Sequence, residues 1–236
     1  MKNLAVCWNT WESFATSLVI YCTYIVMRSD NAQSAGNQQG SPAMRDPSET
    51  TRRAPYSKNE LIAYLQGALH DASLNKGKRY RFTQKHRKWL EQLSQCLGML
   101  GYRSWIYKEG KTRNVFALET LAPFLDFTFD PLTLHGAREQ TGYIRGFFDA
   151  EGGLPHYLDA RFYIQFVQKN KGKLDALKAL LASLGIYTGR VHNPSVHVDP
   201  DYWRFYVRAQ SHADFARIVG SWHPIKQEIL RERMVI

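Results

Sequence analysis

The segment YIRGFFDAEGG, residues 143–153, decides the fold. Gly146 and Ala150 are four residues apart, so they share one face of a helix and let another backbone approach closely. Glu151 stands at the end of this helix, and the two glycines that follow terminate it. The segment therefore predicts a helix with a small-residue contact face and an acid at its C-terminal end.

An earlier helix has the same plan. It starts at a capping box, SKNE at Ser57–Glu60, in which the first and last side chains can satisfy each other's backbone N–H groups. It continues as LIAYLQGALHDAS, with Asp71 near its end. We therefore expect two helices of one kind, each ending in an acid.

A longer repeat follows these two helices. Residues 81–102 (RFTQKHRKWLEQLSQCLGMLGY) and residues 165–186 (QFVQKNKGKLDALKALLASLGI) align without a gap. In each copy the leucines fall at i, i+3, i+7 and i+10, which is one stripe of a helix, and a glycine follows where a helix ends. The matched stripes are Leu90, Leu93, Leu97 and Leu100 in the first copy, and Leu174, Leu177, Leu181 and Leu184 in the second.

A strand with period-two alternation precedes each leucine-rich helix. In the second copy Phe162, Ile164 and Phe166 face one way, and the other face carries basic, aromatic and amide side chains. The first copy alternates in the same way over residues 79–83, and residues 203–208 alternate again. We predict that these polar faces carry bases and no acids. Each copy then reads as helix, strands, helix, strands, helix, and two copies make an α+β protein with pseudo-twofold symmetry.

Composition limits the classes of function. The chain has 236 residues and a net charge of +10, shared by both repeats, and this favours a polyanion such as nucleic acid. Three scattered cysteines fit neither a zinc site nor a disulfide framework, so we expect an intracellular protein. The apolar stretch at residues 14–27 is shorter than the roughly 20 residues that span a bilayer, and we expect no stable membrane partner. We assign residues 1–55 to a poorly ordered leader and linker, 56–135 to the first repeat and 136–236 to the second.

The segment GFFDAEG resembles the LAGLIDADG motif of homing endonucleases, and the resemblance extends over residues 57–236. It implies two motif helices packed side by side on a pseudo-twofold axis, with Gly67, Gly146 and Ala150 at their interface. It also implies that the acids at the helix ends meet at the DNA and bind divalent metal. Antiparallel sheets on either side would form a saddle in the major groove. By resemblance, Asp71 and Glu151 are the metal ligands.

The register of the first motif has two solutions. If Gly67 is matched to Gly146, the acid position falls on Ala72. If Asp71 is matched to Glu151, bulkier side chains take the small positions. We favour Asp71 as the acid, because DAS resembles a looser form of the motif. Loss of this acid would leave a nickase or a DNA-binding protein.

The resemblance implies three further catalytic residues. Gln84 and Gln168, at the ends of the paired strands, match a position that orders water near the scissile phosphates. Lys226, in HPIKQEIL, matches a C-terminal active-site lysine, which can polarise water or offset developing charge. The corresponding first-repeat segment APFLDFTF, residues 122–129, has no lysine.

The polar strand faces are the expected DNA-reading surfaces. Arginine can pair with guanine and glutamine with adenine in the major groove, whereas the two lysines of the first hairpin are suited to phosphate. The DNA-binding candidates are Lys76, Lys78, Arg79, Arg81, Thr83, Arg161, Tyr163, Gln165, Arg204 and Arg208.

Together these residues indicate a monomeric, intron-encoded endonuclease that uses Mg²⁺ or Mn²⁺. It would cut both strands of double-stranded DNA at one site and leave short 3′ overhangs. The alternatives are a non-cleaving maturase that binds intron RNA, and a DNA-binding relic or nickase with a degenerate first site. From the resemblance we expect a mitochondrion or chloroplast, with a prokaryotic cytoplasm as the alternative.

Overall fold

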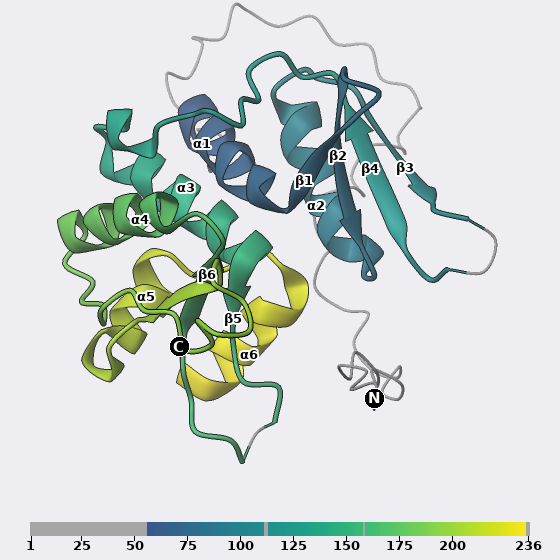
Figure 1. The fold of residues 1–236 in the computed structure, drawn as a ribbon. Coiled ribbons are helices and arrows are strands. Elements are labelled where there is room, and N and C mark those ends of the chain that lie inside the picture. Colours follow the sequence, from purple (N-terminus) through teal and green to yellow (C-terminus); the bar gives the residue numbers. More distant parts are fainter. Residues whose placement is uncertain (1–55, 111–112, 158, 235–236) are drawn as a thin grey trace, which may run out of the picture. The chain divides into compact units, whose positions relative to one another are not determined.

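The computed structural model describes residues 56–110, 113–157 and 159–234, which all belong to one unit (Figure 1). The predicted leader and linker, residues 1–55, lie outside these ranges. In the described part of the chain, no helix has the length and apolar character needed to cross a membrane.

The first repeat is a four-stranded antiparallel sheet with two helices. Its strands lie in the order β1-β2-β4-β3, so the two outer strands flank a central pair. Its elements are α1 (Lys58–Ala68), the 3₁₀ turn η1 (Leu69–Asp71), β1 (Ala72–Asn75), β2 (Arg79–Gln84), α2 (Arg87–Met99), β3 (Ser104–Lys108) and β4 (Phe116–Thr120).

The second repeat has the same topology in a reduced form. Its sheet runs β5-β6-β7, and isolated bridges at Thr188 and His192 continue it beyond β7, where β3 lies in the first repeat. The pseudo-twofold α+β fold is thereby confirmed. The first repeat ends with the short turn η2 (Pro131–Thr133). The elements of the second repeat are α3 (Ala137–Glu151), β5 (Gly152–Gly153), β6 (Gln165–Gln168), α4 (Lys171–Ser183), β7 (Trp203–Tyr206), η3 (Ala209–Ser211), α5 (His212–Ile218) and α6 (Pro224–Met234).

The leucine stripes are buried as the spacing predicts. Six of the eight leucines are fully buried, while the last of each stripe, at the helix end, is partly exposed. Each helix ends in a glycine with positive φ, 82° at Gly101 and 75° at Gly185. The next residue then donates its N–H to a carbonyl five positions back, Tyr102 to Leu97 and Ile186 to Leu181, both at 2.9 Å. This is the capping geometry that releases a chain from a helix.

Two predicted elements differ from the structure. The second-repeat strand begins at Gln165, and residues 161–164 precede the ladder with one bond from Val207 N to Ile164 O. No helix follows β4 in the described first repeat, where only the short η2 turn forms. Asp126 and Asp130 accept hydrogen bonds from backbone N–H groups two residues on, and such local bonds favour turns over helix.

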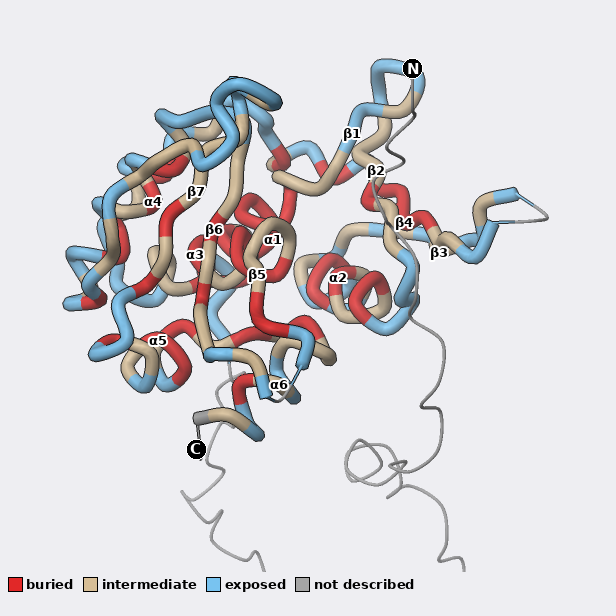
Figure 2. Tube along the Cα trace, turned by 60° about the horizontal axis from the view of Figure 1, so that its bottom comes forward, coloured by how far each residue is buried: buried red, intermediate tan, exposed pale blue. Residues whose placement is uncertain are grey.

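Each repeat has its own apolar core of buried residues (Figure 2). Residues from the C-terminal end of the other repeat pack against each core. Phe129 and Leu134, at the end of the first repeat, pack against the second core. Trp222, near the C-terminus, packs against the first core and lies 4.3 Å from the ring of Tyr64. The exchange fixes both repeats around the α1–α3 pair, which positions the site described next.

Candidate active site and nucleic-acid interface

Helices α1 and α3 touch backbone to backbone. A Cβ added at Gly67 would lie 2.1 Å from the carbonyl oxygen of Tyr143, and one added at Gly146 would lie 2.0 Å from that of Tyr64. Neither space can hold a methyl group. Gly67 and Gly146 therefore lie at the contact between the two helices, and Ala150 faces the core of the first repeat.

The acids at the helix ends occupy equivalent positions. Asp71 directly precedes the first residue of β1, and Glu151 directly precedes the first residue of β5. Those first residues pair with Phe82 and Phe166, which are matched positions of the internal repeat. The strand register therefore matches Asp71 to Glu151.

Each of the two registers that the sequence allows holds in one part of the motif: the glycines match at the helix contact, and the acids match at the helix ends. Gly67 and Gly146 match at the helix interface, yet the acid does not fall on Ala72. A 3₁₀ turn rises about 2.0 Å per residue and an α-helix about 1.5 Å, so three residues of η1 span the same roughly 6 Å as four residues of α3. Asp71 is four residues after Gly67, whereas Glu151 is five residues after Gly146. The larger rise of the 3₁₀ turn compensates for this one-residue difference and places Asp71 at the helix end.

The carboxyl groups of Asp71 and Glu151 are close enough for the charge of Asp71 to affect the ionisation of Glu151. Burial raises the pKa of Asp71 to about 6, although a hydrogen bond from Gln84 and the charge of Lys226 oppose the shift. Burial also raises the pKa of Glu151 to about 7, and the charge of Asp71 adds to this effect. The structure thus brings together an acid from each repeat with the amide of Gln84.

Lys226 caps the C-terminal end of α3. Its Nζ donates to the carbonyl oxygens of Phe148, at 2.6 Å, and Asp149, at 2.9 Å. These carbonyls carry the negative end of the helix dipole. Burial lowers the pKa of Lys226 to about 8, while Asp149, Asp71 and Glu151 favour its charged form. One ammonium group therefore faces three carboxylates.

Asp149 is a buried structural carboxylate that we did not predict. It accepts hydrogen bonds from Tyr64 Oη at 2.8 Å, from Trp222 N at 3.0 Å and from Ser221 Oγ. These contacts fasten the C-terminal segment to both motif helices. Its place in GFFDAEG was visible in the sequence, but its partners come from distant segments.

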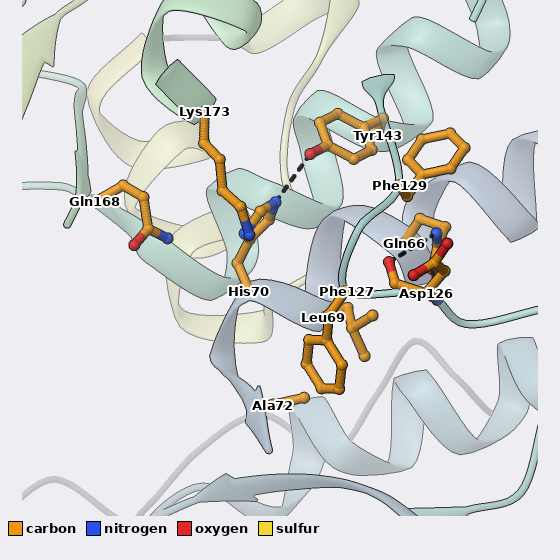
Figure 3. Close-up of a pocket in the computed structure, with 10 residues that line it drawn as sticks. All are labelled: Gln66, Leu69, His70, Ala72, Asp126, Phe127, Phe129, Tyr143, Gln168 and Lys173. Carbon is orange, nitrogen blue, oxygen red and sulfur yellow. Dashed lines mark hydrogen bonds between the residues drawn. The ribbon is translucent and has the colours of Figure 1, made fainter. Parts of the chain in front are cut away.

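Gln168 is not equivalent to Gln84 in its contacts. Its Oε1 accepts from the backbone N–H of Lys169 at 2.8 Å. Its side chain lines a cavity of about 110 Å³ with His70, Tyr143 and Lys173, the last reaching toward His70 (Figure 3). Lys173, which we also did not predict, acts electrostatically on both His70 and Glu151.

Asp71 and Glu151 do not make a complete metal site. Within residues 56–110, 113–157 and 159–234, no group of three or more His, Cys, Asp or Glu side chains could hold a metal ion. Two carboxylates with raised pKa values still favour a nearby cation, because a cation stabilises their ionised forms. Any metal held here would need further oxygen ligands from outside these side chains.

The outer faces of the two sheets differ in charge. On the second sheet Gln165, Arg204 and Tyr206 lie on one face, with the guanidinium of Arg204 5.4 Å from the ring of Tyr206. On the first sheet, Glu119 of β4 pairs with Arg81 of β2 and shares its face. The prediction that these faces carry no acid is therefore wrong for the first sheet. The alternation of β2 alone shows no acid, because Glu119 belongs to the neighbouring strand β4.

The remaining candidates flank these faces. Lys76 and Lys78 are exposed in the β1–β2 hairpin, where Lys76 has a φ of 51°. Thr83 lies on the outer face of β2, opposite Ala117. Arg161 and Tyr163 precede β6, and Arg208 follows β7 with its Nε 3.2 Å from the carbonyl oxygen of Thr188.

Comparison with known proteins gives one family and several similar folds. The sequence model of the LAGLIDADG-like domain matches residues 138–220, and a comparison with curated protein sequences found no match. The fold is similar to the crystal structure of I-DmoI in complex with DNA and Mn, at 22% identity and a TM-score of 0.53, covering 70% of this chain and 98% of that one. I-DmoI in complex with DNA and Ca gives 20% identity, a TM-score of 0.56, and coverage of 75% and 99%. The N-terminal LAGLIDADG domain of DUF199/WhiA gives 14% identity, a TM-score of 0.56, and coverage of 71% and 85%.

The family match lies within the second repeat, whereas the similar folds extend over both. The paired glycines, the equivalent acids and the repeated sheet order are the features that the two repeats share. Residues 138–220 match the LAGLIDADG-like domain, and the described chain has the two-repeat fold of the similar LAGLIDADG structures.

Proposed function

We propose that this protein is a site-specific endonuclease that hydrolyses one phosphodiester bond in each strand of double-stranded DNA and leaves short 3′ overhangs. One observation carries the proposal: an acid from each repeat, Asp71 and Glu151, stands at the same end of a glycine-packed helix pair. The similar structures of I-DmoI, a homing endonuclease, hold DNA and divalent metal, which supports the same partners here.

The donor set fits Mg²⁺ or Mn²⁺ bound together with DNA. Asp71 and Glu151 would hold the ion, and phosphate oxygens, backbone carbonyls and water would complete its ligands. Mg²⁺ is commonly bound through one or two carboxylates plus substrate phosphates, so a pair of acids is sufficient. When bound, the ion would activate water and offset charge on the leaving oxygen.

The neighbouring side chains prepare the two acids. Gln84 donates to Asp71 and so fixes the orientation of its carboxylate. Lys226 is held by two carbonyl oxygens of α3, and its positive charge favours ionised Asp71 and Glu151. A lysine in this place can also stabilise charge that develops on a phosphate oxygen. We propose these two residues, together with Gln168, as the polar surroundings of the reaction.

The sheet faces are the proposed DNA-contacting surface. Arg204, Gln165 and Tyr206 of the second sheet, and Arg79 and Thr83 of the first, offer donors suited to base edges. The exposed lysines of the β1–β2 hairpin are suited to phosphate. A net charge of +10 would add an attraction that weakens as salt rises.

The experiment starts with a duplex selected from a randomised library for binding in Ca²⁺. This duplex, cloned into a plasmid, is then incubated with the protein in Mg²⁺ or in EDTA. We expect linear product in Mg²⁺ and none in EDTA. Glu151→Gln should abolish linearisation while keeping DNA binding. Glu91→Gln, a matched change at an exposed acid of α2, should cleave like the wild type.

The other outcomes separate the alternatives. Nicking without linearisation would assign activity to one acid only, and Asp71→Asn would then leave the nicked product unchanged. Binding without cleavage in Mg²⁺ or Mn²⁺ would refute the endonuclease and indicate a DNA-binding relic. Tight binding to intron RNA with no selected duplex would indicate a maturase. We also propose a monomer encoded in an organellar intron, which sedimentation and the genomic context would test.

A further inference from the structure

Glu119 is a buried carboxylate at the centre of the outer face of the first sheet. It lies on β4, opposite Arg81 of β2 and Trp105 of β3. Only 1% of its surface is exposed. An acid at this place is unexpected, because the face is the one that we propose to contact a polyanion.

The Glu119 carboxylate is hydrogen-bonded from each of the other three strands. Its Oε1 accepts from Asn75 Nδ2 at 2.6 Å and from Tyr107 Oη at 2.7 Å. Its Oε2 accepts from Arg79 Nη1 at 3.1 Å. Arg81 Nε lies 4.0 Å from Oε1. Burial opposes the charge, but the bonds from Tyr107, Asn75 and Arg79 outweigh it and lower the pKa of Glu119.

The donors that Glu119 holds still reach the surface. The side chains of Arg79 and Arg81 are 43% and 23% exposed, and Tyr107 is 37% exposed. The guanidinium of Arg79 also lies 5.6 Å from the centre of the Trp105 ring, and that of Arg81 bonds Glu109 at 2.7 Å. Arg79 is therefore fixed at one edge by Glu119 while its side chain stays partly exposed. Arg81 is fixed by Glu109, and its Nε is buried beside Glu119 while the rest of its side chain stays partly exposed.

In the described residues of the second sheet, no buried carboxylate holds the arginine of the outer face. Arg204 contacts His192 at 3.5 Å and the Tyr206 ring at 5.4 Å, and it forms no ion pair with an acid of the described residues. A free guanidinium adapts to many partners, whereas one fixed in advance loses less freedom on binding and tolerates fewer geometries. The two sheets are therefore built for different tasks.

We propose that Glu119 is a positioning residue for sequence recognition. Its negative charge opposes attraction to DNA, but it holds the guanidinium groups of Arg79 and Arg81 in a fixed arrangement of donors, which suits acceptor-rich base edges such as those of guanine. Tyr107 donates its one O–H to Glu119 and so helps to fix the carboxylate. The first sheet then discriminates between sequences, and the second contributes mainly charge. This inference rests on the DNA binding proposed above but does not require cleavage.

The test measures binding in EDTA, so that it is independent of catalysis. The selected duplex is compared with single base-pair substitutions along its length and with a random-sequence duplex, at several salt concentrations. Glu119→Gln keeps the shape and removes the charge. We expect discrimination to fall about tenfold at the base pairs under the first sheet. Affinity for the random duplex should rise, with a steeper salt dependence by about one unit.

Three controls isolate the effect. Glu91→Gln removes an exposed acid on α2 and should change neither discrimination nor salt slope. Tyr107→Phe removes one donor at a partly exposed site and should give a smaller loss at the same base pairs. Thermal unfolding would identify a variant that fails to fold. Unchanged discrimination in folded Glu119→Gln, equal losses under both sheets, or a wild type without sequence preference would each overturn the proposal.

Discussion

Tyr143 Oη lies 2.8 Å from Nε2 of His70, and this contact mirrors the 2.8 Å hydrogen bond from Tyr64 to Asp149 across the helix pair. His70 and Asp149 both come three residues after the interfacial glycine of their helix. The two tyrosines and their partners therefore obey the pseudo-twofold symmetry in position, but the partners differ in charge. One side of the centre has a buried carboxylate, and the other has an imidazole whose pKa burial lowers to about 3.

The glycine contact between α1 and α3 is the first feature that a mutation can test. Gly146→Ala would place a methyl group 2.0 Å from the carbonyl oxygen of Tyr64, so the helices must separate. We expect a loss of about 3 kcal/mol in the free energy of unfolding, measured by urea denaturation. Gly98→Ala, on an exposed face of α2 with nothing nearby, should instead stabilise by about 0.5–1 kcal/mol. Equal effects of the two changes would contradict backbone contact at Gly146.

The raised pKa of Glu151 makes stability depend on pH in a defined direction. Between its ordinary value and about 7, the folded protein binds more protons than the unfolded chain, so stability falls as pH rises through this window. Glu151→Gln should therefore be more stable than the wild type at pH 8, by about 1–3 kcal/mol, and similar to it at pH 4. Thermal unfolding across pH measures the difference. Glu91→Gln should track the wild type throughout.

Lys226 should hold down the pKa values of both acids. Its charge lowers the pKa of Asp71 and of Glu151, so Lys226→Met should raise both. Carboxyl ¹³C shifts followed through a pH titration report each group. Lys171→Met, at an exposed lysine of α4 paired with Asp175, serves as the matched control and should leave both titrations in place. Unaltered titrations in Lys226→Met would show that its ammonium does not act on the acids.

Acid denaturation should involve the buried histidines. Burial lowers the pKa of His70 and of His223 to about 3, so each binds its proton more readily in the unfolded chain. The contribution of these two histidines to stability should then fall as pH drops from about 6.5 toward 3, opposite in sign to that of Glu151. His70→Gln should lose less stability over this range than the wild type, measured by chemical denaturation. His135→Gln changes an exposed histidine and should retain the wild-type slope.

The repeat made most of the fold predictable from the sequence. Leucine spacing, the glycine stops and the alternation before each leucine-rich helix depend on local geometry, which a sequence displays directly. The acid at the end of α3 was visible for the same reason. The position of Asp71 required more, because the sequence does not show that Leu69–Asp71 tightens into a 3₁₀ turn.

The charge pattern of the site was harder to foresee. Glu119 and Asp149 take their partners from strands and tails distant in sequence, so neither could be assigned from its own segment. Lys173 comes from α4, a helix in which the sequence displays a leucine stripe and no signal for a site residue. Its matched residue in the first repeat is Trp89, which is buried and donates to Tyr64 Oη at 3.1 Å.

Calorimetric titration of Ca²⁺ into the complex with the selected duplex tests the central claim most directly, because it measures cation binding without cleavage. We expect binding by the wild type that is weakened by Asp71→Asn, weakened by Glu151→Gln and lost when both are combined. Glu91→Gln should bind as the wild type does. Undiminished Ca²⁺ binding by the folded double variant in the same complex would contradict a cation site shared by Asp71 and Glu151.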